Sequence, residues 1–265
     1  LYGHMIPSMV EATRIAEASS PDFIDINYGC PVRKIANRGA GAGMLANIPL
    51  MMEMTRAIVD ATSLPVTVKT RLGWDENTKN IREVAEQLQD CGIDALTIHG
   101  RTRAQMYKGE ADWTLIGEVR ENPSIHIPII RNGDITTPKI AGEMFEKYGV
   151  DGIMIGRGAV GKPWLFHQVK HYLKTGETLP DPTVAEKVDI AKEQFTKSLE
   201  WKSEPVGIYE MRRHFSNYFK GISHFKETRI QLLTTLEPER IFELLDFIRE
   251  EWGDLVTENS TGFWS

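Results

Sequence analysis

Short apolar runs alternate with longer amphipathic stretches over residues 23–155. The runs have the lengths and residue types of β-strands and occupy residues 23–28, 66–71, 95–99, 127–131 and 152–155. One apolar stripe at helical spacing, between the second and third runs, comprises Ile81, Val84, Ala85, Leu88 and Cys91. Because a strand, a crossover helix and the next strand need about 30 residues, the spacing of the runs predicts a parallel sheet covered by helices.

Side chains able to do chemistry follow or end five different predicted strands. They are Cys30, Lys69, His99, Asn132 and Gly156 with their immediate neighbours. A (β/α)8 barrel gathers its site from the C-terminal ends of many strands, whereas an open doubly wound sheet concentrates it at one switch point. The distribution therefore favours an α/β fold of the (β/α)8 TIM-barrel class, with about five of its eight strands present.

The pattern changes at residues 174–183, KTGETLPDPT, where glycine and proline predict a linker. Beyond it, amphipathic stretches at residues 184–199, 206–221 and 238–252 predict helices, and no strand pattern returns. We therefore expect a partial barrel domain at residues 1–173 and a helical domain at residues 184–256. Residues 257–265 have the composition of a frayed tail.

The composition is that of a globular protein, with 265 residues, 41% hydrophobic and 26% charged. No run approaches the ~18 apolar residues of a membrane-spanning helix, so we expect no membrane partner. Two cysteines are too few for a disulfide-stabilised secreted scaffold and fit a reducing cytoplasm. A net charge of −6 argues against a general nucleic-acid coat, but it leaves room for a local basic patch.

Cys30 follows the first predicted strand, between Gly29 and Pro31. A free cysteine is often a small core residue, and Cys91 on its apolar helix stripe fits that interpretation. A loop beside glycine and proline is a poor place for core filling. Position alone therefore favours a chemical role for Cys30.

Lys69 stands inside the apolar second strand, where a lysine is rarely buried unless it is paired. It is either an edge residue whose ammonium reaches solvent or a cation that faces an anionic or electron-rich ligand, and we favour the ligand. His99 ends the third strand and precedes Arg101 and Arg103. A single histidine is more often structural than catalytic, but two arginines in its loop indicate a nearby anion.

Glycine-rich loops follow the last two predicted strands. They contain Asn132, Gly133 and Asp134 in one case and Gly156 and Arg157 in the other. Glycine permits the close backbone approach that a phosphate requires. In (β/α)8 proteins the loops after the seventh and eighth strands commonly bind phosphate, so the pair predicts a phosphate site.

Basic residues cluster in two places despite the negative net charge. One cluster follows the cysteine and contains Arg33, Lys34 and Arg38. The other lies in the predicted helical domain and contains Arg212, Arg213, Lys220, Lys226 and Arg229. Charge clusters are usually solvated surfaces, but two of them, one beside a candidate site, indicate a track for nucleic-acid phosphates.

Taken together, these strings resemble the tRNA-dihydrouridine synthase family, most closely its bacterial B-type branch. The matching stretches are DINYGCPVRKI at 25–35, GAGAGML at 39–45, VTVKTRLGWD at 66–75, TIHGRTRAQMYKGEADW at 97–113, NGDI at 132–135 and IGRGAVGKPWLF at 155–166. MRRHFSNYFKG at 211–221 is similar to the signature of the family's helical domain. The resemblance extends to about residue 247.

The resemblance implies an FMN-binding barrel, joined to a helical tRNA-binding domain, that reduces the C5–C6 bond of uridine in tRNA with NADPH. It makes Cys30 the general acid that protonates C5 while hydride passes from the flavin to C6. It assigns Lys69 and His99 to the flavin and the two glycine loops to the FMN phosphate. No metal is implied.

The resemblance also suggests substrate contacts. It makes Asn27 and Arg101 candidates for the uracil and tRNA, and the two basic clusters supply Arg33, Lys34, Arg212 and Arg213 for the tRNA backbone. The target uridine must leave its stack to reach such a pocket.

Two departures from the family pattern shape the expectations. Family members begin with a strand carrying a Pro-Met-Ala-Gly flavin loop and two further strands, which would precede Leu1 and make the five predicted strands the fourth to eighth. Arg131 stands where a small residue is expected before Asn-Gly-Asp. Two alternatives therefore stay open: another FMN barrel that acts on a small molecule, and a flavin-free tRNA-binding fragment without redox activity.

Overall fold

The computed structural model describes residues 1–257, and the predicted tail lies outside the described residues except for Thr257. The chain forms two compact units. The first comprises Leu1–Ile135 and Ile140–Gly156, and the second comprises Thr136–Lys139 and Arg157–Ser265. We call them the barrel unit and the helical unit and describe each by itself.

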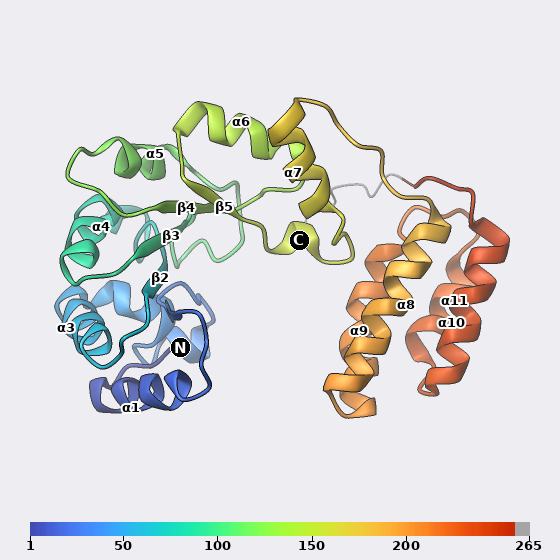
Figure 1. Ribbon diagram of the computed structural model, residues 1–265, viewed down its shortest axis with the longest axis horizontal. Coiled ribbons are helices and arrows are strands. Elements are labelled where there is room, and N and C mark those ends of the chain that lie inside the picture. Colours follow the sequence, from blue (N-terminus) through green and yellow to red (C-terminus); the bar gives the residue numbers. More distant parts are fainter. Residues whose placement is uncertain (258–265) are drawn as a thin grey trace. The chain divides into compact units, whose positions relative to one another are not determined.

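The barrel unit contains the five predicted strands in one parallel sheet (Figure 1). They are β1 (Ile24–Asn27), β2 (Val66–Arg71), β3 (Ala95–His99), β4 (Ile129–Asn132) and β5 (Gly152–Met154). Each strand pairs with the next in sequence, in the order β1-β2-β3-β4-β5. A doubly wound sheet reverses its order at a switch point, whereas successive neighbours are the order of a (β/α)8 barrel. The predicted barrel class is confirmed by this sheet and by the family match described below.

The two faces of the sheet have different chemistry. The apolar face carries Ile24, Ile26, Val66, Val68, Leu96, Ile98 and Ile129, all of them buried. The strand register places the other side chains on the opposite face, which we call the polar face: Asp25, Asn27, Thr67, Lys69, Arg71, Thr97, His99 and Asn132. Side chains alternate between faces along a strand, so the polar face gathers the predicted site residues from four strands.

Helices pack against the apolar face. They are α1 (Ile6–Glu17), α3 (Ile48–Val59), α4 (Ile81–Asp90), α5 (Thr114–Glu121) and α6 (Pro138–Tyr148), with the short α2 (Arg33–Ala36), η1 (Gly41–Ala46) and η2 (Glu76–Thr78) in loops. Figure 1 shows α1, α3, α4 and α5 following one another around the sheet. The predicted stripe of α4 is buried from Ile81 to Leu88, and Cys91 is buried at its C-cap.

The surroundings of Arg131 explain why this position holds an arginine rather than the expected small residue. It is fully buried on the apolar face of β4, with its guanidinium 4.6 Å from the Trp113 ring and 3.8 Å from the Tyr148 ring. One of its nitrogens also donates to the Trp113 carbonyl. Burial lowers the pKa of this arginine to about 10, so it stays charged at neutral pH. The two rings and the carbonyl replace part of the hydration that the guanidinium loses, while its Nε has no hydrogen-bond partner among the described residues.

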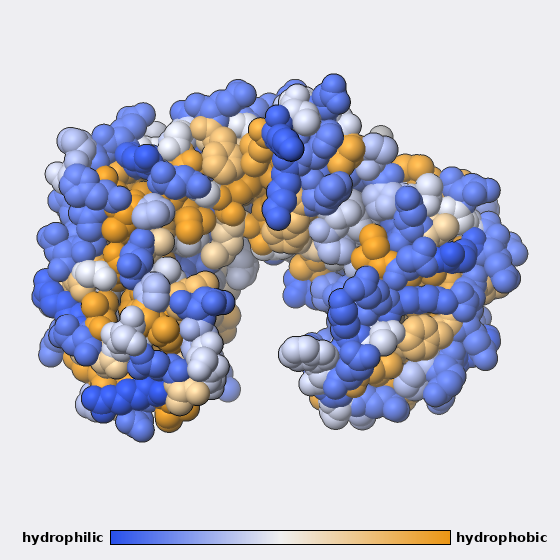
Figure 2. Space-filling view, viewed as in Figure 1, coloured by the Kyte–Doolittle hydropathy of each residue, from blue (hydrophilic) through white to orange (hydrophobic). Residues whose placement is uncertain are grey.

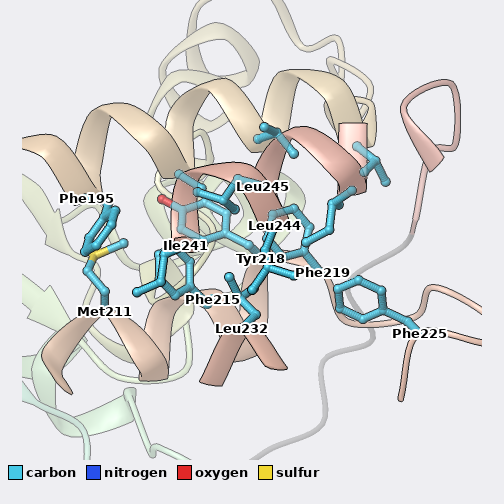
Figure 3. Close-up of a cluster of buried hydrophobic side chains, with 14 of the residues drawn as sticks. Phe195, Met211, Phe215, Tyr218, Phe219, Phe225, Leu232, Ile241, Leu244 and Leu245 are labelled. Carbon is cyan, nitrogen blue, oxygen red and sulfur yellow. The ribbon is translucent and has the colours of Figure 1, made fainter. Parts of the chain in front are cut away.

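The helical unit contains η3 (Arg157–Ala159), α7 (Leu165–Thr175), α8 (Val184–Trp201), α9 (Glu204–Tyr218), α10 (Lys226–Thr234) and α11 (Pro238–Trp252). Thr183 and Glu186 form a capping box at the start of α8. Figure 3 shows the core of α8–α11, which gathers Phe195, Phe215, Tyr218 and Phe219 with aliphatic partners such as Leu245. Polar side chains cover most of the face of this unit that Figure 2 shows.

Side-chain contacts join α7 and the segment before it to the rest of the helical unit. Trp164 packs on Tyr218 with ring centroids 5.8 Å apart, and Gln168 donates to Asp181 at 2.9 Å. These contacts lie within the helical unit, which begins after Gly156 and therefore includes η3 and α7. The linker itself lies within the helical unit.

The prediction of a frayed tail is wrong for its first residue. Thr257 is buried, and its hydroxyl and carbonyl oxygens accept hydrogen bonds from Lys187 Nζ at 2.8 and 3.0 Å. Lys187 is itself fully buried in α8, so its ammonium needs these acceptors. None of the described helices is both long and apolar enough to cross a membrane.

Candidate active site

The loop after β1 presents Cys30. The side-chain oxygen of Asn27 accepts hydrogen bonds from the main-chain N–H groups of Gly29 at 2.9 Å and Cys30 at 3.0 Å. The Cys30 carbonyl accepts from the Ala42 N–H at 3.0 Å, and a Cβ on Gly41 would come within 3.0 Å of the Cys30 Cβ. The half-buried thiol is therefore held by a shaped turn at the C-terminal end of β1.

Lys69 lies on the polar face beside this turn. Its Nζ is 3.6 Å from the position that a Cβ on Gly29 would occupy. Burial, and then the charge of Arg71, lower the pKa of Lys69 to about 8. Within the part of the chain that the structure describes, its ammonium makes no hydrogen bond or ion pair. A partly desolvated cation without a hydrogen-bond or ion-pair partner among the described residues marks this face as a candidate ligand site.

Arg71 is a site residue that the sequence analysis missed. Its Nε donates to the Gly29 carbonyl at 2.7 Å, and its Nη1 donates to the carbonyls of Thr102 at 3.0 Å and Met106 at 2.8 Å. Arg71 therefore ties the Cys30 loop to the loop after β3. Its position two residues after Lys69 in the same strand was the available signal, since both side chains share one face.

His99 and Asn132 are partners in the strand register and lie next to the turn after β4. His99 is buried, and the side-chain nitrogen of Asn132 donates to the Met154 carbonyl at 2.8 Å. Gly133 has φ +127, and a Cβ there would lie 2.7 Å from the Ala111 Cβ and 3.4 Å from His99 Cδ2. The turn can approach His99 this closely because residue 133 is glycine.

Arg101, a predicted substrate contact, and Asp134, a predicted member of the phosphate loop, pair with each other. The fully buried Arg101 makes a bidentate pair with the Asp134 carboxylate at 2.9 and 2.6 Å, and it also donates to the carbonyls of Lys108 and Gly109. Asp134 additionally accepts from the Ala111 N–H at 2.8 Å. These bonds occupy most of the donors of the guanidinium. The pair holds the loops after β3 and β4 together.

The remaining predicted residues lie in different places. Gly156 ends the barrel unit and has no atom within 4 Å of its Cβ position, whereas Arg157 begins the helical unit. Arg33 and Lys34 are exposed on α2, directly after the Cys30 turn.

In the helical unit, the predicted tRNA residues Arg212 and Arg213 lie on α9. The Arg212 guanidinium sits 4.6 Å from the ring of Tyr209 and reaches the Thr234 carbonyl at 3.5 Å. Arg213 is exposed.

The residues on the polar face fit a flavin better than a metal ion. Lys69 offers an unneutralised cation, and Gly133 provides a turn without a side chain beside His99. Among the described residues, no group of three or more His, Cys, Asp or Glu side chains is placed to hold a metal ion. An anionic ligand matches this donor set.

Comparisons with known proteins agree with the fold and the motifs. The family model described as Dihydrouridine synthase (Dus) matches residues 1–250. The probable tRNA-dihydrouridine synthase of Rickettsia conorii is 43% identical over 221 residues, covering 83% of this chain and 66% of that protein. The tRNA-dihydrouridine synthase B of Pseudomonas putida is 37% identical over 255 residues, covering 96% of this chain and 75% of that protein.

A solved structure supports the fold alone. The 6-hydroxypseudooxynicotine amine oxidase of Pseudomonas geniculata N1 superposes with a TM-score of 0.50 at 16% identity, over 69% of this chain and 31% of that chain. The fold and the comparisons thus define a protein of the (β/α)8-barrel class with an appended helical unit. The chain belongs to the dihydrouridine synthase family, and it spans about two thirds of the length of the Rickettsia relative.

Proposed function

We propose that this chain carries out the FMN-dependent reduction of uridine to 5,6-dihydrouridine in tRNA, with NADPH as the reductant. The observation that carries the proposal is the partly desolvated ammonium of Lys69, which has no partner within the described residues and lies beside the turn that presents Cys30. The family match and the tRNA-dihydrouridine synthase names of the relatives support the choice of reaction. Such a substrate and reductant would put the protein in the cytoplasm.

Residues of the barrel unit would hold the flavin. Lys69 and His99 would contact the ring system from the polar face, and Asn132 and Gly133 would lie at the turn after β4. Gly156, whose Cβ position is open, would contribute to the phosphate site. FMN, when bound and reduced by NADPH, supplies the hydride for C6 of uridine. A cation beside the ring favours its reduced, negatively charged form.

Cys30 would donate the proton that completes the reduction. Addition of hydride at C6 places negative charge on C5, and the Cys30 thiol transfers its proton to that carbon. The turn built by Asn27 and Gly41 fixes the direction of the thiol. Because the Asn27 oxygen is occupied by the turn, its amide nitrogen is the group that would serve the uracil.

Basic side chains would bind the tRNA backbone. Arg33 and Lys34 are exposed next to the Cys30 turn, where the phosphates flanking an extruded uridine must lie. Arg212 and Arg213 supply a second set on the helical unit. The helical unit and its basic residues argue against a barrel that acts only on small molecules.

The test combines a visible absorption spectrum with a tRNA assay. We expect near-equimolar flavin in the purified chain and loss of most of it in Lys69→Met. Lys192→Met is the matched control, because that ammonium pairs with Asp246 on the helical unit. A wild-type protein with flavin but no tRNA reduction would favour the small-molecule alternative. Binding of tRNA without any flavin would favour the redox-inactive alternative.

A further inference from the structure

A tryptophan and an arginine lie stacked on the loops after β2 and β3, and the proposed reaction assigns no role to either of them. The guanidinium of Arg103 lies 4.3 Å from the centre of the Trp74 ring, and both side chains are partly exposed. Among the described residues, Arg103 forms no ion pair, and no second aromatic ring packs on Trp74. The pair is therefore a planar, positively charged surface to which no carboxylate is bound.

Main-chain hydrogen bonds hold this pair in place. The Arg103 N–H donates to the Gly73 carbonyl at 3.0 Å, and the Ala104 N–H donates to the Trp74 carbonyl at 2.9 Å. These bonds continue the pairing of β2 with β3 into the two loops. The first loop can turn tightly because residue 73 is glycine, since a Cβ there would collide with the Thr78 carbonyl. A surface fixed in this way loses little conformational entropy when a ligand binds to it.

The pair is bonded to the loop that carries Cys30. Arg103 Nη2 donates to the side-chain oxygen of Asn37 at 3.1 Å, and Asn37 is the residue that follows α2. The segment 30–42 closes on itself, because the Ala42 N–H donates to the Cys30 carbonyl at 3.0 Å. Both loops of the pair also leave the C-terminal ends of parallel strands, as the Cys30 turn does. The stacked pair and the thiol therefore lie at the same edge of the sheet.

The acidic residues that follow the tryptophan are engaged within their own turn. The Asp75 carboxylate accepts a hydrogen bond from the Thr78 hydroxyl at 2.9 Å, and Glu76 pairs with Lys79. Neither carboxylate forms an ion pair with the arginine of the stacked pair in the described part of the chain. The charge of that arginine is therefore available to a ligand.

Further cations lie on the loop to which Arg103 is bonded. Arg33, Lys34 and Arg38 are exposed on α2 or directly after it, and within the described residues none of them forms an ion pair. Indole and guanidinium planes stack with unpaired nucleobases, whereas exposed cations bind the phosphates between them. Planar and charged groups on neighbouring loops thus match a single strand of RNA.

We propose that the Trp74–Arg103 pair is a stacking surface for the base of an unpaired nucleotide next to the uridine that enters the Cys30 site. Extrusion of a uridine removes a stacking partner from the base beside it. The stacked pair replaces that partner without reading the sequence, because every base has a π-face. That the RNA is a tRNA rests on the proposed function.

The affinity of the FMN-loaded protein for unmodified tRNA tests this surface. We expect Trp74→Leu to weaken binding by about 5- to 100-fold. The slope of log affinity against log salt stays unchanged, because no cation is lost. Trp74→Phe keeps an aromatic ring and is expected to stay within about threefold of the wild type. Trp201→Leu is the matched control, because that indole is 86% exposed on the helical unit, and its affinity is expected to equal that of the wild type.

Three outcomes would overturn the inference. They are an unchanged affinity in Trp74→Leu, an equal loss in Trp74→Phe, which would indicate a packing role, and an equal loss in Trp201→Leu. If the Trp74→Leu protein does not fold, Arg103→Lys replaces it, because lysine keeps the charge but lacks the planar group. We expect that variant also to weaken binding with an unchanged salt slope.

A second probe, single-stranded oligouridylate of about twelve nucleotides, separates this inference from the proposed function. A wild-type chain that binds oligouridylate through Trp74 but does not reduce tRNA would contradict the proposed function alone. A chain that reduces tRNA and binds both RNAs equally well in Trp74→Leu would contradict the stacking surface alone. Binding of neither RNA by the wild type would contradict both.

Discussion

Cys30 is the residue on which the proposed chemistry depends most directly. Cys30→Ala removes the proton donor but leaves the turn, because the hydrogen bonds that shape it use the main chain of residue 30. We expect bound flavin to be retained and turnover on unmodified tRNA to fall by roughly 10²- to 10⁴-fold. Cys91→Ala is the control: that thiol is buried against Met52, so its loss lowers stability and spares the chemistry. Unchanged turnover in Cys30→Ala would remove the general-acid assignment.

Lys69 is expected to lower the free energy of unfolding at neutral pH, and this effect is expected to depend on pH. Its pKa falls from 10.5 to about 8 because the fold disfavours the charged form. The loss of folding stability caused by the charged ammonium is therefore fully present below about pH 8, and it disappears as the pH rises toward 10.5. We expect Lys69→Met to increase the free energy of unfolding by about 1–3 kcal/mol at pH 7, with the difference shrinking above pH 8. Urea unfolding at pH 7 and pH 10 measures this, and a destabilised Lys69→Met protein would show that the ammonium has a partner.

At the scale of elements, Gly161 is where the segment between η3 and α7 meets α9. It has φ +69, and a Cβ would collide with the Cβ of Asn217 and lie 3.1 Å from the His214 carbonyl oxygen. We expect Gly161→Ala to destabilise the helical unit by about 2–4 kcal/mol. Gly176→Ala is matched in conformation, with φ +78 and nothing within 4 Å of its Cβ position, and is expected to cost about 1 kcal/mol. If urea unfolding gave equal losses of unfolding free energy in the two variants, backbone strain alone would account for both losses.

The strands were predictable because each combines β-branched residues with a clear break at its end. β2 and β3 have the predicted bounds, and β4 starts two residues later than predicted, after Pro128, which has no N–H to donate. Helix α10 was missed because Leu232 is its one buried residue, so it has no apolar stripe to detect. Packing of Trp164 on Tyr218, which joins these residues within the helical unit, leaves no local signature in the sequence.

The sequence predicted which strand ends carry the candidate site residues, but not the hydrogen bonds and ion pairs between those residues. Lys69, His99 and Asn132 could be found because polar residues in apolar strands are conspicuous. Whether an arginine serves the substrate or the fold depends on its partners. Arg101 proved to be tied to Asp134, which lies 33 residues away in sequence, and no local pattern contains that information.

At the scale of the whole molecule, a net charge of −6 must coexist with the proposed binding to a polyanion. Nonspecific attraction is then weak, so affinity for tRNA depends on a few basic side chains, and its salt dependence counts the phosphates they contact. We expect replacement of Arg212 and Arg213 by serine to weaken tRNA binding and to reduce the slope of log affinity against log salt by about 1–2. The flavin content and the reduction of the flavin by NADPH are expected to stay unchanged.

The control for this double variant replaces Lys197 and Arg240, which also lie in the helical unit but pair with Glu193 and Glu243. Removing them changes the net charge equally without removing the proposed phosphate contacts. If binding followed net charge alone, both double variants would weaken it to the same degree. A slope that changes in the Arg212 and Arg213 variant and not in the control would assign tRNA binding to α9, because release of counterions depends on phosphates contacted rather than on total charge.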